Sequence, residues 1–380
     1  MRNQNVFLRR VQSACSPLIL ISRNVLKSFP VIIIICSILL SGGCTNDQGT
    51  RNEPVKIILD TDMGSDCDDA GALALLHRYA DLGLAEIIGC IYSSGKVPYG
   101  AGITEAINIY YGRPDIPIGA YYGDEVGDPV DKMTAGKLVR DTVAFGHSII
   151  HNTDAEEQTQ LNRRLLSEQE NGGITYITIG HTKGLYELLV SGPDDISPLS
   201  GRELIAEKVD RWIALGALNA NNEGNYFVRD WNFFFNETAP YTGYLVENFP
   251  APVYYIDAGT DVMTGKSLKY TAPGNIVRTV YRDWLWEVME KTLDDQRPSW
   301  DLAAVYFAVK GTGDFLVNTG RGRLEFDAER GSRWHPGENA LPEQYFIMQK
   351  PGTDGSFADY LNEMIAAEPE LATGSPGSGY

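Results

Sequence analysis

The chain has 380 residues, with 50 Asp and Glu against 32 Lys and Arg, which gives a formal net charge of −18 at pH 7. This negative excess disfavours nucleic acid and anionic membrane surfaces as partners, because both would be repelled at long range. It is compatible with a metal ion or with a small neutral or cationic ligand.

The first 43 residues contain five basic side chains, no acidic one and an apolar run over residues 29–40. This arrangement is typical of a secretion signal, and the run is too short for a comfortable transmembrane helix. The small residues that lead into Cys44 resemble the lipobox of bacterial lipoproteins. We therefore expect a signal over residues 1–43, a lipid anchor on Cys44, a polar linker over residues 44–54 and attachment to a bacterial membrane, facing the periplasm or the cell exterior. An uncleaved anchor helix is the alternative.

Apolar runs alternate with helical patterns along the rest of the chain. The runs are continuous, which is typical of strands buried on both faces of a mainly parallel sheet. Strands are expected at residues 57–59, 87–92, 174–179, 212–215 and 253–256, and helices at residues 68–79, 103–111, 184–190, 276–293 and 302–309. We therefore predict one α/β domain over residues 55–372, with a Rossmann-like, mainly parallel central sheet and helices on both faces, and a disordered tail over residues 373–380.

An acidic segment directly follows the first predicted strand. Five carboxylates fall within its eleven residues, those of Asp60, Asp62, Asp66, Asp68 and Asp69. Carboxylates this close repel one another unless a cation compensates their charge, and their oxygen atoms suit calcium or magnesium better than zinc. One or two of them could simply cap the following helix, but five are more than capping requires. The segment therefore predicts a divalent-metal site at the carboxyl end of a strand, where ligands gather in such sheets.

The same segment, from Asp60 to Leu73, resembles the D-x-D-P-G-x-D-D-A-x-A-L signature of the inosine-uridine-preferring nucleoside hydrolase superfamily. Three further blocks, at residues 110–119, 224–233 and 297–304, resemble the family's GRxDIPV, GN…AEFN and HDPxA segments in the same order. The resemblance implies the nucleoside hydrolase fold and calcium-dependent hydrolysis of the N-glycosidic bond of a nucleoside or related ribosyl compound. It also implies a homo-oligomer, since family members commonly form dimers or tetramers.

The metal ligands implied by this resemblance are the carboxylates of Asp62, Asp69 and Asp301 and the backbone carbonyl of Ile179. Together with a water and the ribose 2′ and 3′ hydroxyls, they would supply the about six to eight oxygens that calcium prefers. Asp62 would also act as the base toward the water. The signature loop is two residues longer than in the family, which makes Asp66 a substitute ligand.

The resemblance also implies how the sugar is held. Asp68 would accept a hydrogen bond from a ribose hydroxyl. Asn225, Asp230 and Asn232 would hold the rest of the sugar and favour its positively charged transition state, with Asp230 standing where the family has Glu.

Three positions depart from the family pattern or are left open by it. Lys96 falls where family members carry a ribose-contacting Asn. Trp300 replaces the His that helps the nucleobase depart, and an indole can stack on a flat ring but cannot protonate a leaving group. His181 follows Gly180 in a loop of the same edge and is either an ordinary polar loop residue or part of the pocket.

Two other interpretations remain alongside the nucleoside hydrolase. One is a calcium-containing surface lipoprotein that binds a sugar or nucleoside without cleaving it, and the other is a hydrolase of a different glycoside. Retention of Asp62 beside the ligand carboxylates favours an enzyme, because a pure binder needs no base there. Cys67 and Cys90 could form a disulfide in an oxidising compartment, but both lie in apolar settings that favour buried thiols.

Overall fold

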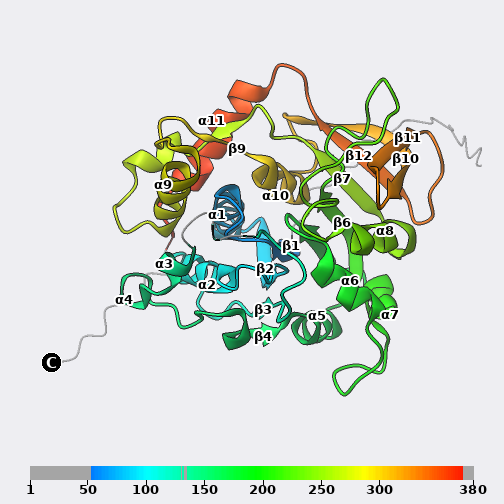
Figure 1. Cartoon of the computed structure of the whole chain (residues 1–380), viewed down its shortest axis with the longest axis horizontal. Coiled ribbons are helices and arrows are strands. Elements are labelled where there is room, and N and C mark those ends of the chain that lie inside the picture. The colour runs from blue at the N-terminus through cyan, green and yellow to red at the C-terminus, as the bar shows by residue number, and fades with distance from the viewer. Residues whose placement is uncertain (1–52, 130, 132–134, 371–380) are drawn as a thin grey trace, which may run out of the picture. The chain divides into compact units, whose positions relative to one another are not determined.

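The computed structural model describes residues 53–129, 131 and 135–370 (Figure 1). The predicted signal, the anchor at Cys44, most of the linker and the predicted tail lie outside these residues. Among the helices of the described part, none is both long and apolar enough to cross a membrane.

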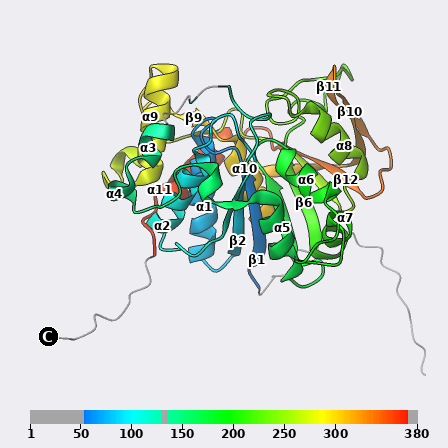
Figure 2. The ribbon, with the colours of Figure 1, turned by 60° about the horizontal axis from the view of Figure 1, so that its bottom comes forward.

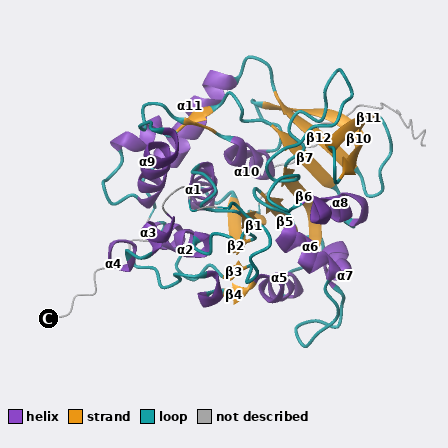
Figure 3. Ribbon diagram, viewed as in Figure 1, coloured by secondary structure: helices purple, strands orange, loops and turns teal. Residues whose placement is uncertain are grey.

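A ten-stranded sheet forms the centre of the fold (Figure 3). Its strands, in spatial order, are β11 (Gly331–Pro336), β10 (Leu316–Asp327), β12 (Gln344–Gln349), β7 (Val253–Asp257), β6 (Val209–Leu215), β5 (Ile174–Thr178), β1 (Val55–Thr61), β2 (Ala85–Tyr92), β3 (Ile118–Ala120) and β4 (Glu156–Glu157). Every pair from β12 to β4 is parallel, whereas β10 pairs antiparallel with both β12 and β11. The mainly parallel sheet predicted from the continuous apolar runs is therefore confirmed.

Helices cover both faces of this sheet (Figures 1 and 2). One face packs against α1 (Asp68–Asp81), α2 (Gly100–Tyr110), α9 (Ile276–Met289), α10 (Trp300–Lys310) and α11 (Asp354–Ala366). The other face packs against α5 (Gln158–Ser167), α6 (Lys183–Val190), α7 (Gly201–Lys208) and α8 (Ala239–Asn248). Successive residues of β1 alternate between these two cores, with Ile57 and Leu59 in the first and Ile58 in the second. The fold is thus an α/β sandwich of three layers, as expected when a strand is buried on both sides.

Strand order reverses beside β1. The chain runs outward from β1 through β2 and β3 to β4 and then returns to the other side of β1 with β5. Ligands bind outside the carboxyl ends of the strands at such a switch point. The loops after β1 and β5 flank this crevice, and the N-terminus of α10 also lies there, because Asp301 N–H donates to the Asp68 carboxylate at 3.3 Å.

Several elements of the fold are not predicted from the sequence. They include the antiparallel strands β10 and β11, the small sheet of β8 (Met263–Thr264) and β9 (Arg297–Pro298), and the helices α5, α7, α8 and α11. Cys67 and Cys90 are both buried free thiols.

Candidate active site

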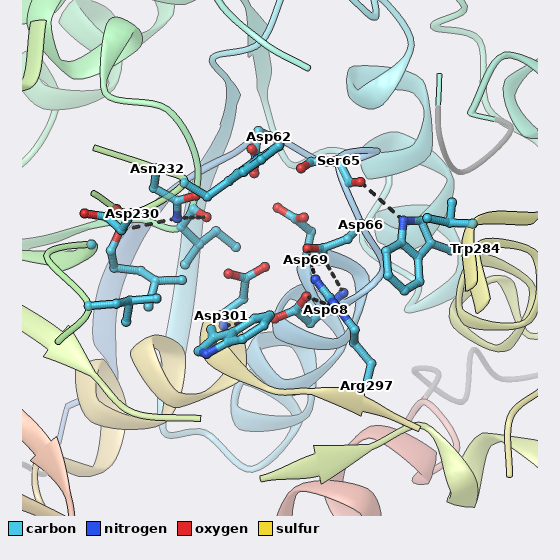
Figure 4. A pocket seen from close by; sticks show the side chains of 17 residues that line it. Asp62, Ser65, Asp66, Asp68, Asp69, Asp230, Asn232, Trp284, Arg297 and Asp301 are labelled. Carbon is cyan, nitrogen blue, oxygen red and sulfur yellow. Dashed lines mark hydrogen bonds and ion pairs between the residues drawn. The ribbon is translucent and has the colours of Figure 1, made fainter. Parts of the chain in front are cut away.

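A cavity of about 290 Å³ lies at the switch-point edge of the sheet. Figure 4 shows Asp230 and Asn232 on one side of it and Trp284 and Arg297 on the opposite side, with acidic side chains between them. The acids that line it are Asp62, Asp66, Asp68 and Asp69 from the loop after β1 and the first turn of α1, and Asp301 from the first turn of α10. Segments more than 200 residues apart in sequence therefore meet in one pocket.

Two local features bring these carboxylates inward. A turn after β1, closed by a hydrogen bond from Ser65 N–H to the Asp62 carbonyl at 3.0 Å, needs the left-handed backbone of Gly64 (φ 109°). Asp68 is the first residue of α1 and Asp301 is the second residue of α10, so both lie in first turns, at the positive ends of the helix dipoles. Both helix ends therefore favour negative charge at the cavity.

The tightest acidic group consists of Asp66, Asp69 and Asp301, each with a carboxylate oxygen within 4.8 Å of the other two. Asp62 lines the same cavity but does not belong to this group. The resemblance implies Asp62, Asp69 and Asp301 as carboxylate ligands, with Asp66 as a substitute ligand, and this group holds Asp66 in place of Asp62. The physical reason is the longer loop, which carries Asp66 beside Asp69.

The electrostatics of the acids favour a bound cation. Burial, and then repulsion between neighbouring carboxylates, raises the pKa of Asp62, Asp69 and Asp301 well above the usual range. Within the described chain, Oδ2 of Asp62 and Oδ1 of Asp68 are buried without a hydrogen-bond partner. A hard divalent cation would compensate the charge and coordinate carboxylate oxygens. The residues present therefore fit such an ion.

Arg297 is a site residue that sequence reasoning missed. Its guanidinium pairs with the Asp66 carboxylate, and its Nε lies 3.6 Å from Oδ1 of Asp68. It is sandwiched between the rings of Trp284 and Trp300, at 4.5 and 4.8 Å from their centroids. Burial opposes the charged form of Asp66, but the Arg297 charge together with hydrogen bonds from Asp68 and Arg297 lowers the pKa of this carboxyl group. Arg297 thus neutralises one edge of the acidic cluster and fixes two aromatic walls.

His181, which the sequence leaves open, lies directly against the base candidate. Its Nε2 is 3.3 Å from Oδ2 of Asp62, and the ring is fully buried. Burial, with a smaller contribution from Lys96, lowers the pKa of His181 to about 4. The imidazole that lies against the Asp62 carboxylate is therefore neutral at neutral pH.

Asp230 and Asn232, the two cavity residues that are predicted to hold the sugar, also brace the cavity wall. The Asp230 carboxylate accepts hydrogen bonds from the N–H groups of Ala217 and Phe233, both at 3.0 Å. The Asn232 amide donates to the carbonyl oxygen of Ile179 at 2.9 Å, so the predicted carbonyl ligand is already oriented by a neighbour. A carbonyl oxygen has a second lone pair, which leaves Ile179 able to coordinate a cation.

Lys96 and Asn225, predicted to contact substrate, do not line the cavity. Lys96 pairs instead with Glu237, and Asn225 sits in a tight turn with φ 46°, its N–H bonded to the Asn222 carbonyl at 3.0 Å. Trp300 does line the cavity, and its indole N–H donates to Oγ1 of Thr260 at 3.0 Å.

Comparison with solved structures identifies the fold of this protein. Neither a family model nor a curated protein matches the sequence. A solved plant nucleoside hydrolase matches with a TM-score of 0.60 at 17% identity, covering 83% of this chain and 99% of that one. A purine-preferring ribonucleoside hydrolase from Gardnerella vaginalis gives 0.57 at 15% identity (82% and 98% covered), and an inosine-uridine-preferring nucleoside hydrolase from Bacillus anthracis gives 0.57 at 14% (82% and 99%). The protein therefore has the nucleoside hydrolase fold, which confirms the fold implied by the sequence resemblance.

Proposed function

We propose that the protein is an exported, lipid-anchored hydrolase that cleaves the N-glycosidic bond of a nucleoside or related ribosyl compound with the help of calcium. The observation that carries this proposal is the meeting of five carboxylates, four of them buried, around one cavity at the switch point of a nucleoside hydrolase fold. Three of them can share a cation, and two others keep a buried oxygen without a hydrogen bond.

The roles of the residues follow from their positions. A bound divalent cation would polarise a water as a Lewis acid and would coordinate the vicinal hydroxyls of the sugar. Asp62 takes the proton from the attacking water, because it lines the cavity beside the acidic cluster. Asp68 accepts a hydrogen bond from a ribose hydroxyl through Oδ1. The surrounding carboxylates favour the positive charge that develops on the ribosyl ring as the bond breaks.

The side of the cavity opposite Asp230 and Asn232 suits a flat leaving group. Trp284 lies on this side (Figure 4), Val288 and Trp300 also line the cavity, and the cavity wall formed by described residues contains no histidine. An aromatic ring can stack on these indoles, but no imidazole there can protonate it as it leaves.

This arrangement predicts a preference for leaving groups that depart without an acid. A general acid contributes roughly 10²–10⁴-fold. We therefore expect kcat for 4-nitrophenyl riboside to exceed kcat for inosine by about that factor, measured as initial rates with calcium present. Equal kcat values for the two substrates would show that an acid assists departure after all.

A second prediction concerns pH and calcium. Because burial and repulsion raise the pKa values of Asp62, Asp69 and Asp301, the folded metal-free protein binds more protons than the unfolded chain above pH about 4, so these groups lower its stability as pH rises. A cation that needs the ionised carboxylates reverses this effect. The rise in Tm caused by calcium is therefore expected to be larger at pH 8 than at pH 5. At a hundredfold excess of calcium over Kd, the gain in the free energy of unfolding is about 2.7 kcal/mol. A calcium-induced rise in Tm that is the same at pH 5 and pH 8 would contradict this prediction.

The function itself is tested by product release. The purified protein is incubated with calcium and a panel of purine and pyrimidine nucleosides, and free ribose is measured, with a chelator-treated sample as the control. We expect ribose from at least one nucleoside and none after chelation. If nucleosides bind but no sugar is released from any of them, the protein is a binding lipoprotein rather than an enzyme.

A further inference from the structure

A second cavity, of about 560 Å³, adjoins the first. Leu218, Asp230 and Trp231 line both, so the two cavities share a wall. The rest of the second cavity is formed by the loop after β6, by Asp257 at the carboxyl end of β7 and by Met348 of β12. Nothing in the proposed chemistry uses this space.

The loop that forms the second cavity is held in a fixed shape. The Asn222 amide donates to the carbonyls of Asn219 and Tyr226, and its oxygen accepts from Tyr226 N–H, at 2.9 to 3.1 Å. Further along, Val228 forms a pair of backbone hydrogen bonds with Ser332 of β11. A wall that is ordered in advance lowers the entropy cost of binding a ligand.

Polar groups on this wall are left available. The side-chain amide of Asn219 has no hydrogen-bond partner in the described chain, and the Asp257 carboxylate accepts only from Asn219 N–H, through Oδ2 at 3.0 Å. The rings of Tyr226 and Trp231 are 59% and 42% exposed beside them. An amide, a carboxylate oxygen and exposed aromatic faces suit hydroxyl groups and the apolar face of a sugar.

The charges at this cavity argue against a phosphate. Asp257 and Asp230 both lie in its wall, and the chain as a whole is strongly negative. Arg229 is the cavity's cation, but its guanidinium already donates to the Glu329 carbonyl and packs over the Phe234 ring at 4.7 Å. An uncharged, hydroxylated group therefore fits better than an anion.

We infer that the second cavity binds an uncharged, hydroxyl-rich substituent, such as a second sugar unit, carried at the 5′ position of the ribosyl substrate. This inference rests on the proposed function, which places the vicinal diol of ribose at the acidic cluster and the rest of the ring at Asp230 and Asn232. The 5′ carbon then faces Asp230. Because Asp230 and Trp231 line both cavities, a 5′ substituent that extends past these two residues reaches the second one.

Binding of uncleavable C-nucleosides separates this inference from catalysis. The probes are formycin B and its 5′-O-glucosyl derivative, titrated by calorimetry into the purified protein with calcium. We expect the glucosyl derivative to bind about tenfold tighter or more, as one or two added hydrogen bonds would give. Asn219→Gly, which keeps the left-handed backbone at φ 62°, and Asp257→Asn should each remove most of this preference.

The control variant is Asn171→Ala, at an exposed position before β5 and therefore at the opposite edge of the sheet, which should leave the preference unchanged. Equal or weaker binding of the glucosyl derivative would overturn the inference while leaving the proposed function intact. Tighter binding of formycin B 5′-phosphate than of the glucosyl compound would overturn the assignment of an uncharged group. If neither C-nucleoside binds, the proposed ribosyl site fails and the inference fails with it.

Discussion

The substitution Asp62→Asn is expected to lower kcat for ribose release by roughly 10²–10⁴-fold, the range that a general base contributes. The amide keeps the size and position of the side chain but cannot accept a proton from water. The measurement is the initial rate at saturating nucleoside and calcium.

A matched control is Asp359→Asn, which makes the same change in charge at an exposed position of α11 and should leave kcat unaltered. Because Asp62 lies outside the group formed by Asp66, Asp69 and Asp301, its variant should also retain most of the calcium affinity. An Asp62→Asn protein that keeps more than about a tenth of the activity would exclude Asp62 as the base.

The substitution Asp301→Asn is expected to weaken calcium binding by at least about 100-fold. Even the mutation of a residue that only orients a metal ligand lowers metal affinity by about 10–100-fold. Asp301 is one of three acids whose oxygens lie within 4.8 Å of one another, and it is nearly fully buried. Calorimetric titration of the chelator-treated protein with calcium measures the effect.

Asp66→Asn provides an internal comparison for this prediction. Arg297 already shares the Asp66 carboxylate, so a bound cation gains less from it than from Asp301. We therefore expect Asp66→Asn to weaken calcium binding less than Asp301→Asn does. Wild-type affinity in the Asp301 variant would show that the ion, if any, binds elsewhere.

The parts of the fold that can be predicted from the sequence are those with strong local patterns. β1 and α1 follow from a continuous apolar run and an acidic helix start, and the sheet class follows from runs buried on both faces. β10 was not predicted because only three of its twelve residues, Leu316 to Asp327, are buried and because it holds no continuous apolar run. Antiparallel strands of this kind leave a weak signal in a search for buried strands.

Site residues that lie in the acidic motif itself could be predicted from the sequence. Residues whose place in the site depends on the packing of distant segments could be predicted less well. Asp62, Asp68, Asp69 and Asp301 all reach the cavity. Arg297 does so from a two-residue strand, β9, and its partnership with Asp66 depends on how distant segments pack. Lys96 and Asn225 were assigned by matching motif positions, but neither lines the cavity, so position in a motif did not fix position in space.

The central claim is that acidic side chains from both ends of the domain close around one hard cation that holds a vicinal diol. A crystal structure of the protein grown with calcium and ribose tests it most directly. We predict one calcium ion bound by oxygens of Asp66, Asp69 and Asp301, with the 2′ and 3′ hydroxyls of ribose completing its coordination. A ribose bound away from these acids, or a calcium ion held by other residues, would contradict the claim.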